Sequence, residues 1–437
     1  MHTCIDPPFR RKPDPNRTMG PPLLMKAPDQ SIAPRADHDK RWQVLGYVCL
    51  GVVLSMTTWF SATAITPALI QVFGLTLAGS SWLTNMVQLG FVVGALASSI
   101  VSLPDLVAPR RLMGIAGLVA ALANLTLLWV PDASWLLLAR FVTGMALAGL
   151  YPPALKLIST WFVQGRGLAL GAVIAALTLG SAFPNLVRAL THGLVWQDVV
   201  IAASLATVIG AAILALFAQE GPFPFSKAVF DPRQVGAVLR NRPLALANLG
   251  YFGHMWELYA MWGWFLAFAT AALPGLGFTH AHDASLITFI VIASGTIGAL
   301  AGGYMADKIG RTATASVMLI ISGTCAIMIC FAFAGPAWLF VSIAILWGMS
   351  VIGDSAQFSA MATEVSDPRY VGTALALQLG IGFALTIASI RLTPVLAELI
   401  GWRWSFLMLV PGPVVGIMAM LILRQQPEAC RIAHGRK

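Results

Sequence analysis

Long apolar runs constrain this chain more than any other feature of its sequence. From Gln43 onward they follow one another, each with the length of about 20 residues that a helix needs to cross roughly 30 Å of hydrocarbon. Only 10% of the residues are charged, where a soluble domain carries about 25%. Helices are preferred over strands because the runs are long and lack alternation, and because each run must satisfy its own backbone hydrogen bonds in lipid. We expect an all-α integral membrane protein.

The runs predict twelve transmembrane helices. Very short connections, such as Pro131-Asp132 and Gly335-Pro336, make neighbouring helices antiparallel. The expected spans are 43–66, 80–103, 112–130, 134–156, 167–190, 196–218, 244–271, 284–305, 312–333, 337–361, 371–396 and 402–423.

The chain divides into two similar halves. A charged hairpin follows the second span of each half, and Asp105 and Asp307 in these hairpins are 202 positions apart. Gly149 recurs as Gly353, 204 positions later. We therefore expect two pseudo-symmetric six-helix halves with a linker between them and a tail at each end. The tail at the N-terminus is rich in proline and bases and is expected to be disordered. The expected segments are 1–42 (tail), 43–218 (first half), 219–243 (linker), 244–423 (second half) and 424–437 (tail).

The placement of positive charge predicts the orientation. All but four of the 27 Lys and Arg residues lie in the tails and the even-numbered loops. This bias places both termini in the cytoplasm of a multi-pass protein of the cell membrane. The net charge of +9 is explained by this topology, so nucleic acid is not an expected partner. The lipid bilayer is the expected surrounding, and we expect a monomer.

Several other function classes find no support in the sequence. The five cysteines show no metal spacing and predict free thiols. No Gly-x-x-x-x-Gly-Lys-Ser/Thr phosphate loop is present. No set of nucleophile, base and orienting residue stands out. We expect no metal, no cofactor and no enzymatic activity.

The second hairpin carries Gly303, Asp307, Lys308, Gly310 and Arg311 in the spacing G-x-x-x-D-[RK]-x-G-[RK]. This pattern resembles a motif of the Major Facilitator Superfamily of secondary transporters and matches every fixed position of it. The first hairpin departs from the motif, because Val101, Leu106 and Ala108 replace fixed residues. It keeps the acid and a pair of bases shifted by one position, namely Asp105, Arg110 and Arg111.

The resemblance implies twelve helices in two halves, with a solute site near the midplane between them. It also suggests a mechanical role for Asp307, which is expected to approach the N-terminus of the fifth span near Arg166. A carboxylate is stabilised there, so the contact would close a gate on the cytoplasmic side. The alternative is that these charges only set the topology.

Charged side chains inside spans are costly in lipid and need a reason to be there. Arg140 begins the pattern Arg-x-x-x-Gly in the fourth span, which is similar to a family motif linked to proton coupling or solute charge. Alternatively, Arg140 reaches the outer interface or pairs with a carbonyl group.

Tyr251, His254 and Glu257 lie on one face of the seventh span, because residues three apart on a helix are neighbours. This face either exchanges protons and contacts solute, or holds a neutral hydrogen-bonded pair. Asp354, deep in the tenth span, either pairs with a base such as Lys156 or makes a local hydrogen bond beside Gly353. Other polar residues within spans are candidates for lining a cavity: Gln88, Asn124, Asn185, Gln357 and Gln378.

We therefore expect a secondary transporter of a small solute that works by alternating access with proton coupling. Arg140 and the basic balance favour an organic anion. The alternative is efflux of hydrophobic or cationic compounds, because aromatic residues attract cations and crowd the seventh span around Glu257. A second alternative is a transporter-like receptor or scaffold.

Overall fold

The first half of the chain supplies six bundle helices, several of them interrupted. The computed structural model describes residues 35–101, 103–162, 165–191, 195–223, 232–280, 282–367 and 370–435. The elements of the first half are α1 (Arg35–Ser55), η1 (Met56–Thr58), α2 (Ser61–Ala64), α3 (Thr66–Phe73), α4 (Leu77–Ser80), α5 (Trp82–Ile100), α6 (Leu103–Leu106), α7 (Pro109–Leu125), η2 (Thr126–Leu128), α8 (Ala133–Leu147), α9 (Tyr151–Ser159), α10 (Arg166–Leu190) and α11 (Trp196–Phe217).

The second half repeats this pattern after a linker that contains two short helices. Its elements are η3 (Pro232–Gln234), α12 (Val235–Arg240), α13 (Arg242–Ala272), η4 (Leu273–Leu276), α14 (Asp283–Ile309), α15 (Arg311–Ala332), α16 (Ala337–Gly353), α17 (Ser355–Val365), α18 (Val371–Ile400), α19 (Trp402–Ser405), η5 (Phe406–Leu409), α20 (Pro411–Gln425) and η6 (Pro427–Gly435).

All regular elements within the described ranges are helices, as the sequence predicted. Eleven helical segments there are long and apolar enough to cross a membrane. The first predicted span, 43–66, is occupied by the consecutive helices α1, η1 and α2. With it, the bundle agrees with the expected twelve-helix architecture. Most of the predicted tail, residues 1–34, lies outside the described residues, and α1 begins at Arg35.

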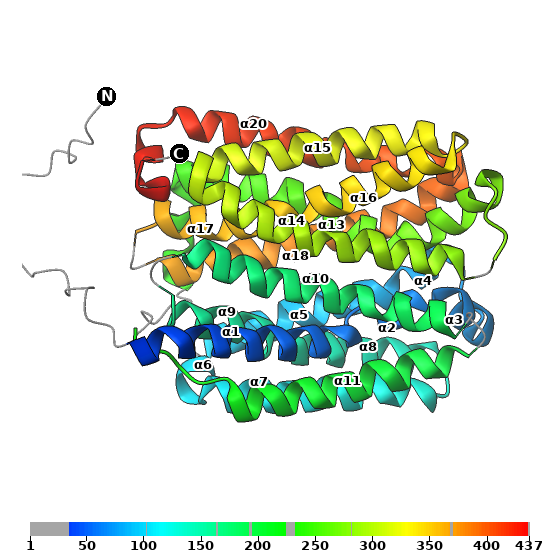
Figure 1. Ribbon diagram of the computed structural model, residues 1–437, viewed down its shortest axis with the longest axis horizontal. Helices are drawn as coiled ribbons and strands as arrows, with labels where there is room; N and C mark the ends of the chain where they lie inside the picture. The colour runs from blue at the N-terminus through cyan, green and yellow to red at the C-terminus, as the bar shows by residue number, and fades with distance from the viewer. Residues whose placement is uncertain are drawn as a thin grey trace, which may run out of the picture.

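The long helices run side by side along the longest axis of the molecule (Figure 1). The start of α1 and the final segment η6 lie at one end of the bundle, which we call the termini face. Helices α3 and α4 lie at the other end, the opposite face. The halves meet where α10 packs on α14 and where α5 packs on α18.

Two spans are broken at equivalent places in the halves. In the fourth span α8 ends at Leu147 and α9 begins at Tyr151, with prolines in its first turn. In the tenth span α16 ends at Gly353, and Asp354 separates it from α17. Because proline supplies no backbone N–H, it is tolerated at such a helix start. The breaks fall beside Gly149 and Gly353, the residues that the repeat relates.

Glycines allow equivalent helix pairs to approach closely in both halves. A Cβ on Gly90 of α5 would overlap the carbonyl oxygen of Phe141 on α8. In the second half, a Cβ on Gly298 of α14 would overlap the carbonyl of Met349 on α16. In membranes, van der Waals packing holds helices together in place of the hydrophobic effect, and small residues allow the backbones to approach closely enough for it.

Candidate functional site

Glu257 lies midway along α13 and is completely buried. Its Oε1 accepts a hydrogen bond from Trp347 Nε1 of α16 at 2.7 Å, and its Oε2 accepts one from Ser322 Oγ of α15 at 2.9 Å. Both partners are neutral donors on neighbouring helices of the second half. The carboxyl group can therefore gain or lose a proton without breaking an ion pair.

His254 is one turn away from Glu257 but has a different partner. Its Nδ1 lies 2.8 Å from Asp354 Oδ1, and the two side chains are 1% and 2% exposed. Asp354 stands at the break between α16 and α17, so this close contact joins α13 to the broken span. His254 Nε2 is buried and has no hydrogen-bond partner among the described residues. The contact of Asp354 with His254 was not among the pairings considered from the sequence.

Tyr251 lies on the same face of α13 and is buried. Its ring is 6.1 Å from the His254 ring and 6.1 Å from the ring of Phe358 on α17. A Cβ on Gly382 of α18 would overlap the Tyr251 ring. The predicted set of Tyr251, His254 and Glu257 therefore shares one buried region inside the second half. Asp354 joins this region through its contact with His254.

Arg140 of α8 is completely buried in the first half. Its Nη1 donates to the carbonyl of Thr58 at 3.0 Å, and Nη2 donates to the carbonyl of Trp59. These carbonyls lie where the first span breaks between η1 and α2. Further hydrogen bonds go to the Leu83 carbonyl, Ser61 Oγ and Asn124 Oδ1. The geometry matches the pairing with carbonyl groups that was the structural alternative for this residue.

The candidate cavity-lining residues have different surroundings. Asn124 connects α8 to α11 within the first half: its Oδ1 accepts from Arg140, and its Nδ2 donates to Ser204 Oγ at 3.0 Å. Gln357 accepts from Arg311 Nη1 at 3.3 Å, and Gln378 donates to Asn248 Oδ1 at 2.9 Å. Both side-chain polar atoms of Gln88, and Oδ1 of Asn185, are buried without a hydrogen-bond partner among the described residues. Those two have unused capacity to bind solute or water.

An aromatic cluster fills the centre between the halves. Trp59 of the first span lies 5.9 Å from Tyr259 of α13, measured between ring centroids. Phe91 of α5 lies 4.7 Å from Phe383 of α18. The cluster consists of Trp59, Phe60, Phe91, Tyr259, Trp262 and Phe383, all buried. Within the described chain, the indole N–H groups of Trp59 and Trp262 have no acceptor, so this apolar region keeps two donors.

On the termini face, Asp307 meets α10 where the sequence placed it. A Cβ on Gly167, in the first turn of α10, would lie 3.1 Å from Asp307 Oδ1. The carboxylate thus faces the positive end of a helix of the other half. Gly310 has φ +91°, a conformation that favours glycine, and it links α14 directly to α15. Glycine at this motif position therefore allows a sharp reversal of the chain.

Arg311 begins α15 and makes a forked contact with Glu364 near the end of α17. Its Nη2 is 2.7 Å from Glu364 Oε1, and its Nε is 3.0 Å from Oε2. The backbone N–H of Ala433, in η6, donates to the same carboxylate at 3.0 Å. Glu364 belongs to no motif, so nothing in the sequence pointed to it.

The first copy of the motif is less well defined. Asp105 lies in the short helix α6, and its side chain is outside what the structure describes. Arg110 and Arg111, in the first turn of α7, are exposed. Lys308 is exposed as well and lies 5.5 Å from the centre of the Tyr304 ring.

The opposite face also has a contact between the halves. Arg391 of α18 donates to the Ala78 carbonyl in α4, and its Nη1 lies 3.4 Å from Ser81 Oγ. One turn deeper, Asn85 Nδ2 donates to the Ile387 carbonyl at 3.2 Å. In this structure the halves therefore touch through polar groups at both ends of the bundle.

A sequence model of the Major Facilitator Superfamily matches residues 48–353 and 258–436 of this chain. The chain belongs to the Major Facilitator Superfamily. Its fold is similar to that of a bacterial homologue of the human lysosomal transporter Spinster in an inward-facing, occupied conformation. That comparison has a TM-score of 0.63 and 17% identity, and it covers 88% of this chain and 97% of the other.

Curated relatives of this superfamily member are named as transporters. The "Probable sulfoacetate transporter SauU" of Cupriavidus necator is 22% identical over 62% of this chain and 65% of its own length. Monocarboxylate transporter 13 of Rattus norvegicus is 25% identical over 71% of this chain and 70% of its own length. The match to the sulfoacetate transporter thus spans just under two thirds of that protein.

Proposed function

We propose that this superfamily member is a secondary transporter that moves a small solute by alternating access and couples the movement to protons. Family membership and relatives named as transporters support transport over catalysis. The observation that carries proton coupling is the buried carboxyl group of Glu257 with two neutral donors. Such a group can bind a proton from one side and release it to the other when access changes.

The His254–Asp354 contact supports a path from this carboxyl group to the moving parts. His254 lies one turn from Glu257 on α13, and its partner Asp354 stands at the break of the tenth span. A change in protonation of Glu257 would alter the balance of charge at this break. Proton binding and helix movement would then be linked through one cluster of side chains.

We further propose a small organic anion as the solute. Support comes from the names of the relatives, which specify sulfoacetate and monocarboxylates. Arg140 contributes less to this proposal than the sequence suggested, because its guanidinium group is already hydrogen bonded to five acceptors.

Efflux of hydrophobic or cationic compounds is the second candidate function. The cluster of six aromatic side chains between the halves supports efflux, because aromatic faces bind cations and apolar rings. Its location between the halves fits a site that both access states share.

The orientation is part of the same proposal. Both termini would face the cytoplasm of the cell membrane, so the Asp307 contact with α10 would close the cytoplasmic gate. The charge bias of the tails and the even-numbered loops supports this placement.

Exchange of Glu257 for Gln tests proton coupling in reconstituted vesicles. Gln keeps the shape of a protonated carboxyl group and can still accept from Trp347 Nε1, but it does not titrate. We expect accumulation of labelled sulfoacetate driven by a pH gradient to fall at least about tenfold. Exchange of solute at equal concentrations, without a gradient, should stay close to the wild-type rate.

Glu398→Gln is the matched control, because Glu398 is an exposed acid near the end of α18. Its uptake should equal that of the wild type. Normal gradient-driven accumulation by the Glu257→Gln protein would show that Glu257 is a structural hydrogen-bonding residue, and coupling would have to be sought at Asp354.

A further inference from the structure

A small cavity lies at the opposite face, within the first half and away from the central aromatic cluster. Its volume is about 180 Å³, and its walls come from α3, the end of α10 and the start of α11. The lining combines apolar side chains with polar groups from Gln71, Arg188 and Thr191. None of the described lining residues is acidic. The cavity has space for a molecule of only a few heavy atoms.

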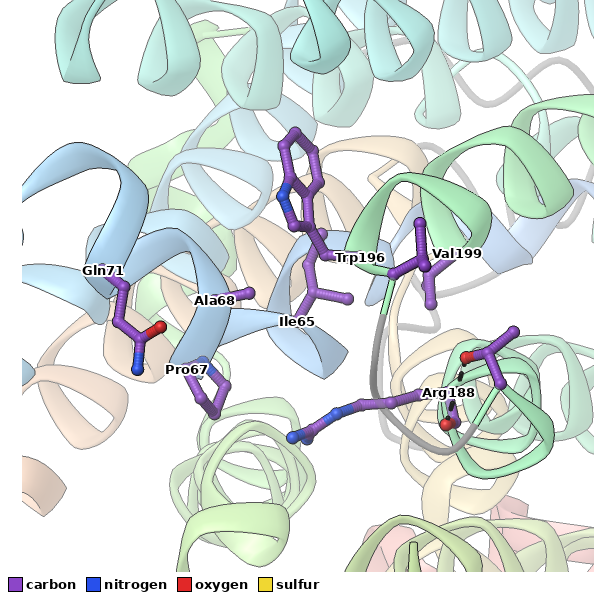
Figure 2. A pocket seen from close by; sticks show the side chains of 9 residues that line it. Ile65, Pro67, Ala68, Gln71, Arg188, Trp196 and Val199 are labelled. Carbon is purple, nitrogen blue, oxygen red and sulfur yellow. Dashed lines mark hydrogen bonds between the residues drawn. The ribbon is translucent and has the colours of Figure 1, made fainter. Parts of the chain in front are cut away.

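Arg188 gives this cavity its charge. Figure 2 shows its side chain reaching from α10 toward Pro67 on α3, so that the guanidinium group lies between the walls. Nη1 is buried and has no hydrogen-bond partner in the part of the chain that the structure describes. A buried donor without a partner loses the free energy of its hydrogen bonds with water, and more so when it is charged. An anion in the cavity would restore the missing hydrogen bond.

The start of α11 adds positive potential to the same place. Val195, Trp196 and Val199 line the cavity at the N-terminal turn of this helix. No hydrogen bond from a described side chain caps that turn, and the helix dipole favours negative charge beside it. Asp198 in the same turn is exposed and offsets part of this potential, so Arg188 is the main source of positive charge at the cavity. Arg188 and the helix start therefore favour the same kind of ligand from two walls of the cavity.

We propose that this cavity binds the oxyanion group of a small organic solute, a carboxylate or a sulfonate, before the solute reaches the centre. Arg188 is the recognition residue, and α3, which continues from the first span, forms the wall facing it. The small volume selects for short acids over large amphiphiles. This inference deepens the proposed anion transport and depends on it only for the direction in which the solute travels.

Binding to the purified full-length protein in detergent tests the proposal without any transport step. Sulfoacetate, propionate and the neutral isostere propionamide are titrated calorimetrically into the wild type, Arg188→Gln and Arg188→Lys. We expect Arg188→Gln to weaken binding of both anions roughly tenfold or more, and Arg188→Lys to fall between it and the wild type. Binding of propionamide should be weak in every protein and unaffected by these substitutions.

Two further variants separate charge from shape. Arg403→Gln removes another base near the opposite face, one that donates to the Cys330 carbonyl outside the cavity, and should bind anions like the wild type. Ala68→Leu fills the cavity without changing its charge and should weaken binding of both anions. Thermal unfolding of each variant is measured alongside, so that loss of binding is scored only in folded protein.

Equal anion affinity in Arg188→Gln and wild type would overturn the proposal, and so would a wild type that binds neither anion. Binding of inorganic sulfate alone, with no competition from sulfoacetate, would assign the cavity to an inorganic ion and also overturn it. Proteins that bind anions through Arg188 but carry none in vesicles would instead reject the transport function and leave the binding site standing. The two failures are thus distinguishable.

Discussion

At the scale of single residues, Arg140 is a buried cation surrounded by uncharged acceptors. Five hydrogen bonds attach it to Leu83, Thr58, Trp59, Ser61 and Asn124. The Thr58 and Trp59 carbonyls lie at a helix break, where the regular backbone partner is missing. Arg140 therefore stabilises the break in the first span, because it donates hydrogen bonds to carbonyl groups that lack a backbone donor there.

Replacement of Arg140 by Gln should destabilise the fold. Several buried carbonyl groups would lose their donor, and we expect the free energy of unfolding to fall by about 2–5 kcal/mol. Thermal unfolding in detergent measures this, with Arg110→Gln as an exposed first-half control that should melt like the wild type. A variant that melts normally but does not transport would instead place Arg140 in proton coupling or solute binding.

The sequence identified the ionisable residues of the site but not their partners. Hydropathy and spacing were enough to single out His254, Glu257 and Asp354, because charged groups stand out in apolar runs. Which helix faces which depends on rotation and packing, and a single sequence does not contain that information. Trp347 and Ser322 were therefore missed as partners of Glu257, since a tryptophan and a serine in a span have many other uses.

At the scale of helices, the internal repeat of the sequence pointed to equivalent positions in the two halves. The relation of Gly149 to Gly353 coincides with breaks at the same place in both halves, and close packing at Gly90 and Gly298 joins equivalent helix pairs. The interruption of the first span near Trp59 was not predicted. It carries neither proline nor glycine at the break. Two kinds of hydrogen bond meet there: the hydroxyls of Thr58 and Ser61 donate to carbonyls three residues earlier, and Arg140 donates to the Thr58 and Trp59 carbonyls.

Close packing of α14 on α16 makes Gly298 sensitive to a single methyl group. A Cβ there would overlap the Met349 carbonyl, which belongs to the backbone and has little room to move. We expect Gly298→Ala to lower the free energy of unfolding by about 1–3 kcal/mol. Gly263→Ala in α13 is the control, because its Cβ would meet no heavy atom within 4 Å. Equal melting temperatures for the two variants would contradict the tight crossing.

At the scale of the whole molecule, polar contacts join the halves at both ends of the bundle. Asp307 faces the start of α10 on the termini face, and Arg391 binds Ala78 and Ser81 on the opposite face. The proposed alternating access requires that one end open while the other stays closed. In that mechanism the two contacts would oppose each other in one conformational equilibrium, and removal of either should favour opening at its own end.

This opposition predicts rescue. Asp307→Asn should slow transport up to about fivefold, because loss of one exposed charge at a helix end shifts the equilibrium by up to about 1 kcal/mol. The solute dissociation constant should change by less than about threefold, since Asp307 lies far from the central cluster along α14. Adding Arg391→Gln weakens closure at the opposite end and should restore much of the rate. Glu220→Gln, an exposed acid beyond α11, serves as the control. If Asp307 and Arg391 served folding alone, the double variant would transport more slowly than either single variant. If Asp307→Asn lost solute binding in step with transport, Asp307 would belong to the solute site.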